Sequence, residues 1–73
     1  MSMLLGQLTN QQLVAMVRDD DLVDTYMGTH EDGCAAREQG AMDIVAETQE
    51  VCTLLAARFT AAQWEELHQR RMK

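Results

Sequence analysis

The chain has 73 residues, of which 47% are hydrophobic, but it contains only one Phe, one Trp and one Tyr, and no proline. A domain of this size buries only about 60% of its unfolded surface, which excludes a deep substrate cleft with a supporting shell of residues. The formal net charge of −6 disfavours direct binding to nucleic acids and membrane surfaces, and it favours basic partners.

Residue types that favour helices dominate the composition, so the sequence predicts an all-α fold. We expect a single domain over residues 1–73, built as a small bundle of three to four helices at about 10–18, 20–28, 34–58 and 61–72. Two cysteines are too few for a disulfide framework, and the sequence shows neither a signal peptide nor a membrane-spanning apolar run. The expected location is the cytoplasm, with reduced thiols.

The segment LTNQQL, at Leu8–Leu13, carries the signals of a helix start. Thr9 is the expected N-cap residue, and Gln12 stands three residues later, where it closes a capping box. The apolar residues at the two ends of the segment occupy the positions of a hydrophobic staple. The first predicted helix begins after this cap and continues to about residue 18.

A break in the helix is expected at Asp19–Asp21. At 100° per residue, the apolar side chains after this run face roughly 110° away from those before it, and one straight helix would bury Asp20 and Asp24. Acidic residues at this point can cap a second helix and interact favourably with the positive end of its dipole.

The segment MGTHEDG, at Met27–Gly33, predicts a loop, because Gly28 can end one helix and Asp32 can start the next. One long central amphipathic helix is then expected over residues 34–58, with apolar residues within an arc of about 120°. Gly40 lies inside this helix and indicates a close helix crossing or a late helix start. A helix of about 25 residues is roughly 37 Å long. Because the short segments cannot cover it, we expect a homodimer with antiparallel long helices.

The segment FTAAQW, at residues 59–64, repeats the first pattern, with Thr60 as the N-cap and Gln63 closing the box. This pattern ends the long helix near residue 58 and starts the last helix. The residues expected to face inward from that helix are Trp64, Leu67 and His68.

The acidic charge is unevenly distributed, since residues 1–57 hold ten acidic and two basic residues. Such a surface can dock a protein with a basic or nucleic-acid-binding surface, and an exposed Trp can anchor the interface. The candidate partner-binding residues are Asp19, Asp20, Asp21, Asp24, Asp43, Glu47, Glu50 and Trp64. The favoured interpretations are nevertheless structural, namely N-capping and a solvated helix face for the first four residues, and a core anchor for Trp64.

The C-terminal residues Arg70, Arg71 and Lys73 are the candidate nucleic-acid contacts. Three charges bind phosphate only weakly, and the acidic body opposes such binding. The favoured interpretation is a basic helix end that complements the helix dipole. The alternative is a small dimeric DNA-associated regulator that presents this tail.

The residue types that bind transition metals strongly are His30, Cys34, Cys52 and His68. His30 and Cys34 are four residues apart and can share a metal, but Cys52 lies 18 residues further along the same predicted helix, roughly 27 Å away. No metal motif is present, and no third orienting group supports a Cys–His pair. We expect no metal, no cofactor and no catalytic residues, and a metal- or redox-sensing module through His30 and Cys34 is the third hypothesis.

The leading hypothesis is a non-catalytic acidic interaction module that regulates or inhibits another protein. Small, acidic helical proteins without proline are common among phage and mobile-element accessory proteins, which is an analogy of composition and not a motif.

Overall fold

A computed structural model describes residues 8–71, and within this range the chain is helical and has no strand. Its elements, in chain order, are α2 (Asn10–Ala15), the 3-10 turn η1 (Asp19–Asp21), α3 (Leu22–Glu38), α4 (Met42–Ala56) and α5 (Ala61–Arg71). The predicted all-α class is confirmed, but the division into helices differs from the expectation in the middle of the chain.

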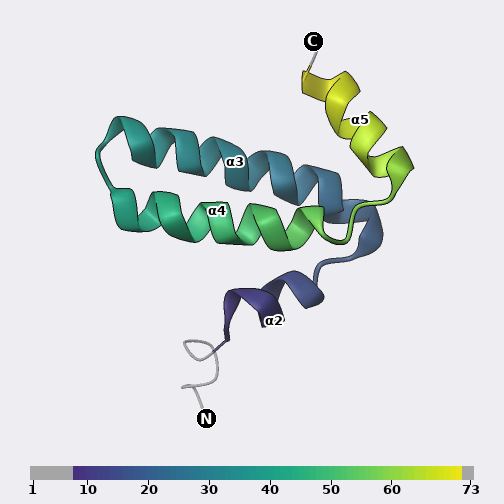
Figure 1. The fold of residues 1–73 in the computed structure, drawn as a ribbon, viewed down its shortest axis with the longest axis horizontal. Coiled ribbons are helices and arrows are strands. Elements are labelled where there is room, and N and C mark those ends of the chain that lie inside the picture. The colour runs from purple at the N-terminus through teal and green to yellow at the C-terminus, as the bar shows by residue number, and fades with distance from the viewer. Residues whose placement is uncertain (1–7, 72–73) are drawn as a thin grey trace.

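The helices form a nearly flat arrangement (Figure 1). Helices α3 and α4 lie antiparallel, α2 packs on the side of α4 away from α3, and α5 lies beside the start of α3. The principal extents are 40 × 29 × 15 Å. Because an α-helix with its side chains is about 10–12 Å across, the shortest extent leaves room for little more than one layer of helices.

Both predicted helix starts are confirmed by reciprocal hydrogen bonds. The Thr9 N–H donates to Gln12 Oε1 at 2.8 Å, and the Gln12 N–H donates to Thr9 Oγ1 at 3.1 Å. The same pair of bonds joins Thr60 and Gln63, at 2.8 and 3.3 Å. Each box satisfies two backbone N–H groups near the start of a helix, so α2 and α5 begin where the sequence indicates.

The predicted break at Asp19–Asp21 is also confirmed, as a 3-10 turn between α2 and α3. Helix α2 ends at Ala15, earlier than the expected residue 18. Arg58, after the end of α4, donates through Nη1 to the carbonyl oxygens of Val14 and Val17, at 2.6 and 2.8 Å. These bonds add a charged donor to carbonyl groups at the end of a short helix, where Val14 O also accepts from the Val17 N–H at 3.1 Å.

The predicted loop at Met27–Gly33 is wrong, because this segment forms the middle of α3. Gly33 faces Thr48 of α4 so closely that a Cβ atom built on it would lie 2.7 Å from Thr48 Oγ1. Gly33 therefore permits a close approach of two helices and does not interrupt its own helix. Packing against α4 outweighs the local loop signal.

The predicted single helix over 34–58 is wrong as well, because the chain reverses between α3 and α4. Gly40 has a φ of +76°, which favours glycine, and it follows the C-cap of α3. The Gly40 N–H donates to Arg37 O at 3.1 Å and the Ala41 N–H donates to Ala36 O at 2.9 Å. This is a Schellman motif, and it turns the predicted long helix into an antiparallel hairpin.

The hydrophobic core lies where α2, α3 and α4 meet. Val14, Leu22 and Leu55 form the buried cluster, and Leu22 and Leu55 are fully buried. Phe59 closes the cluster toward α5 and contacts the Tyr26 ring, with centroids 5.5 Å apart. The far part of the hairpin extends away from this core (Figure 1).

Candidate functional site

The α3/α4 hairpin, residues 22–56, carries all of the net charge of the protein. It contains seven carboxylates and one basic residue, a formal charge of −6, whereas the other residues contain five of each sign. All seven carboxylate side chains belong to exposed residues. The candidate site is therefore a protruding acidic hairpin and not the acidic run Asp19–Asp21 alone.

Six of the seven carboxylates, all except Asp32, follow two rows on the hairpin. Asp24, Glu31 and Glu38 are seven residues apart on α3, so they lie on one line along that helix. Asp43, Glu47 and Glu50 form a similar row on α4. At 100° per residue, each row lies on the side of its helix away from the other helix. The two rows therefore follow the two outer edges of the hairpin, which we call the acidic edges.

Three of the four predicted acidic residues near the break are already paired within the molecule. Asp19 Oδ1 accepts from Arg58 Nη2 at 2.8 Å, and Asp20 lies 3.4 Å from Arg18 Nε. Asp24 accepts from Arg70. Asp21 is exposed and precedes α3. The structure thus places Asp19–Asp21 at the junction of helices, apart from the α4 row of Asp43, Glu47 and Glu50.

The basic end of α5 turns toward the acidic body. Arg70 donates to Asp24 of α3 and also lies 3.0 Å from Glu66 Oε2, one turn earlier in α5. The pKa of Arg70 is raised, first by the hydrogen bond to Asp24 and further by the negative charge of both carboxylates. Arg71 is exposed, and Lys73 lies outside the described residues. The hypothesis of a DNA-associated regulator needs Arg70 as a free cation that contacts phosphate, whereas Asp24 and Glu66 already bind this side chain.

The predicted inward face of α5 is only partly correct. Leu67 is buried, but Trp64 is 46% exposed and His68 is exposed as well. The Trp64 ring contacts Phe59 edge-on, with centroids 4.9 Å apart, so the predicted staple forms at the surface. Leu67, and not Trp64, is the residue that anchors α5 in the core. The exposed part of the Trp64 ring remains available to a partner.

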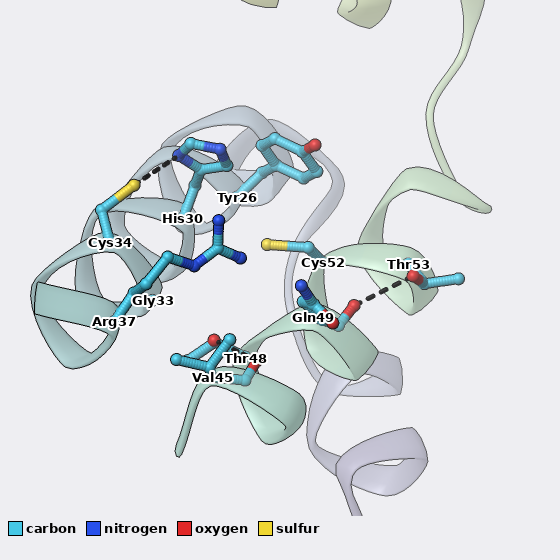
Figure 2. Close-up of a pocket in the computed structure, with 10 residues that line it drawn as sticks. All are labelled: Tyr26, His30, Gly33, Cys34, Arg37, Val45, Thr48, Gln49, Cys52 and Thr53. Carbon is cyan, nitrogen blue, oxygen red and sulfur yellow. Dashed lines mark hydrogen bonds between the residues drawn. The ribbon is translucent and has the colours of Figure 1, made fainter. Parts of the chain in front are cut away.

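A groove along the seam of α3 and α4 brings together residues that the sequence placed apart (Figure 2). Its cavity volume is about 370 Å³, and none of the ten lining residues labelled in Figure 2 is acidic. Cys34 and Cys52 both line it, so the expected separation of roughly 27 Å along one helix does not apply. The reason is the reversal at Gly40, which brings α4 back along α3.

The thiols in this groove differ in their surroundings. Cys34 is exposed, and its Sγ lies 3.8 Å from His30 Nδ1, while the His30 ring stacks on Tyr26 with centroids 6.3 Å apart. Burial raises the pKa of the Cys52 thiol, so this thiol stays uncharged at neutral pH. Within residues 8–71, no group of three or more His, Cys, Asp or Glu side chains is arranged to hold a metal ion.

Sequence reasoning missed this groove because it assigned its α3 residues to a short helix, a loop and a long helix. A helical signal was present across the predicted loop, since Tyr26, His30, Cys34 and Arg37 recur at intervals of four, four and three. The glycines of the segment MGTHEDG concealed that periodicity.

None of the helices in the described part of the chain is both long and apolar enough to cross a bilayer. No protein-family model, no curated protein and no solved structure matches this chain, so its function is inferred from its own geometry.

Proposed function

We propose that the protein is a non-catalytic interaction module that binds a basic, nucleic-acid-binding surface of another protein through its acidic edges and thereby inhibits or regulates that protein. The observation that carries this proposal is the concentration of the whole net charge, −6, on a hairpin of 35 residues that extends from the core. Complementary charge accelerates association and selects a basic partner over an acidic one.

The arrangement of the carboxylates supports an interaction role better than a purely solvated face. Within residues 8–71, ion pairs engage Asp19, Asp20, Asp24 and Glu66, and none involves the α4 row. Two apolar side chains of the same helix are also exposed, since Met42 is 60% and Ile44 48% exposed. Helix α4 therefore presents negative charge together with apolar contact area, which a partner can desolvate.

The flat shape of the molecule also supports an interaction role. A domain commonly packs two layers of secondary structure around its core, whereas this chain has little more than one. Large parts of the helices are therefore open on both broad faces, and the thickness of 15 Å lets the hairpin enter a groove of a partner. The homodimer and the cytoplasmic location remain predictions.

The test is a competition experiment with the protein and a fractionated extract of its native host. Extract proteins are bound to immobilised duplex DNA, the protein is added, and the released proteins are identified by mass spectrometry. The wild type is expected to release a specific DNA-binding protein and to form a complex with it that weakens steeply as salt concentration rises.

Two variants that lose the same number of negative charges distinguish the effect of the acidic edges from the effect of net charge. The edge variant combines Glu31→Gln, Glu47→Gln and Glu50→Gln, and the control variant combines Asp20→Asn, Asp21→Asn and Glu65→Gln. The edge variant should lose release and complex formation, and the control should retain them. Equal activity of the two variants would reject the acidic edges as the binding surface.

The DNA-associated alternative makes a different prediction in the same assay. If the C-terminal residues bind DNA, the protein itself is retained on the duplex, and Arg70→Glu with Arg71→Glu abolishes that retention. The ion pairs of Arg70 with Asp24 and Glu66 weigh against this outcome, because DNA would have to displace both carboxylates.

A further inference from the structure

The α3/α4 groove differs from the rest of the hairpin in its charge. The hairpin contains seven carboxylates and a single basic residue, Arg37, and the groove is lined by Arg37 and by none of the carboxylates. In residues 8–71 the ion pairs involve Arg18, Arg58 and Arg70, and Arg37 takes part in none of them. An acidic hairpin thus carries one concave surface whose only charged side chain is a guanidinium.

The groove also supplies neutral hydrogen-bond donors around this charge. Figure 2 shows the Arg37 guanidinium directed toward His30 and toward Cys52 on the facing helix. His30 Nδ1 lies 3.8 Å from Cys34 Sγ, and in the tautomer in which the thiol donates to Nδ1, the imidazole can donate to a ligand through Nε2. The amide of Gln49 offers further donors from α4.

The two threonine hydroxyl groups in the groove carry no charge, and both donate to carbonyl oxygens of α4. Thr48 Oγ1 donates to Val45 O, and Thr53 Oγ1 donates to Gln49 O, both at 2.9 Å. Their protons are used within α4, so the donors that remain for a ligand include the charged guanidinium, the imidazole, the Gln49 amide and the Tyr26 hydroxyl. This set of donors favours an anionic group over a cationic one.

The remaining lining is apolar and suits a flat body next to the anionic group. The Tyr26 ring lies on one side and the uncharged Cys52 thiol on the other, and Val45 is buried beneath. The volume of about 370 Å³ lies near the lower end of the range for small-molecule sites, about 300–1,000 Å³.

We propose that the α3/α4 groove binds a small organic carboxylate with a flat apolar body. The carboxylate accepts two hydrogen bonds from the Arg37 guanidinium, and the body packs between Tyr26 and Cys52. This site is separate from the acidic edges, so a ligand here gives the interaction module a second, independent binding activity.

The proposal is tested by titrating the isotope-labelled full chain with sodium benzoate and following the NMR signals of the backbone and of the Arg37 and Gln49 side chains. Benzamide, which is neutral and nearly the same shape, is the first comparison ligand, and inorganic phosphate, which lacks the apolar body, is the second. We expect saturable shifts centred on the groove with benzoate, and binding weaker by about tenfold or more with either comparison ligand.

The matched variants are Arg37→Gln and Arg18→Gln, which remove the same charge from two exposed positions. Arg37→Gln should lower benzoate affinity by about tenfold or more, whereas Arg18→Gln should leave it unchanged. The proposal is overturned if benzoate gives no saturable shifts at millimolar concentrations or if Arg37→Gln binds it as the wild type does. It is equally overturned if benzamide or phosphate binds as tightly as benzoate. None of these results bears on the acidic edges, whose residues lie outside the groove.

Discussion

Gly28 and Gly33 lie five residues apart in α3, but only Gly33 faces another helix closely. A Cβ atom at Gly28 would have no neighbour within 4 Å, whereas one at Gly33 would lie 2.7 Å from Thr48 Oγ1 and 3.4 Å from Thr48 Cβ. Thr48 cannot move away easily, because a β-branched side chain has few rotamers in a helix and its hydroxyl is bonded to Val45 O. Gly33 is therefore needed for the close contact of α3 with α4, whereas Gly28 could be replaced by a residue with a side chain.

Gly28→Ala should raise the free energy of unfolding by about 0.5–1 kcal/mol, because alanine favours the helix and restricts the unfolded chain. Gly33→Ala should lower it by about 1–2 kcal/mol, because overpacking against Thr48 exceeds that gain. Urea unfolding followed by circular dichroism measures both values. Adding Thr48→Ala to Gly33→Ala should restore part of the lost stability, and a Gly33→Ala protein as stable as the Gly28→Ala protein would contradict the close contact.

At the scale of helices, the features that could be predicted from sequence are those that depend on neighbours along the chain. Both capping boxes join residues three positions apart, and the break at Asp19–Asp21 follows from a change of apolar face within one segment. The α3/α4 hairpin depends instead on the contact of Gly33 with Thr48 and on the positive φ of Gly40. The contact of Gly33 with Thr48 is not a local property, so MGTHEDG resembled a loop. The Schellman motif at Gly40 is local, but a glycine inside a long amphipathic pattern also fits a close helix crossing, so residues 34–58 resembled one helix.

The candidate site, too, could be predicted from the sequence only in part. The excess of carboxylates and the candidates on α4 are evident in the sequence, but their arrangement on two opposite edges requires the antiparallel pairing of α3 and α4. The groove with Arg37 exists only because that pairing brings the two helices together. Charge could be predicted, whereas the shape that presents it could not.

Arg58 determines whether α2 stays attached to the hairpin. Helix α2 has six residues, too few to be stable alone, and it is held by Val14 in the core and by the bonds from Arg58 to the carbonyls of Val14 and Val17. The Arg58 side chain is 30% exposed, so these charged hydrogen bonds are partly shielded from water.

Arg58→Met should lower the free energy of unfolding by about 2 kcal/mol, because it removes the charged hydrogen bonds to the carbonyl groups of Val14 and Val17 and leaves Asp19 without its cation. Amide hydrogen exchange should become faster in α2 before it does in α3. Arg18→Met is the matched control, since Arg18 pairs only with the neighbouring Asp20 at the surface, and its effect should stay within about 0.5 kcal/mol. Similar effects of the two substitutions would show that Arg58 does not hold α2 in place.

For the whole molecule, one layer of helices leaves apolar side chains uncovered. Within the described residues, large hydrophobic side chains are exposed on or next to three helices, namely Leu13 on α2 with Leu8 and Met16 just outside its ends, Met42 and Ile44 on α4, and Trp64 on α5. The expected homodimer was based on a long helix that the structure divides in two. The homodimer is still predicted, but now from the exposed apolar residues on α2 and α4. A second copy of the chain can cover these residues with a second layer of helices.

The predicted dimer is opposed by charge, since each copy carries −6, so association should strengthen as salt screens the repulsion between the hairpins. Sedimentation equilibrium over a range of protein and salt concentrations is expected to show a dimer at high concentration. Leu13→Gln with Ile44→Gln should shift the equilibrium toward the monomer by roughly a thousandfold, because two apolar contacts of about 1 kcal/mol each are lost in both copies.

Ala46→Gln, at an exposed position of α4, is the control and should leave the dimer intact. A monomer at all concentrations and salts would reject the homodimer. In that case the uncovered faces of α2 and α4 belong to the surface that a different partner covers, and the loss of partner release by Ile44→Gln in the competition experiment would identify it.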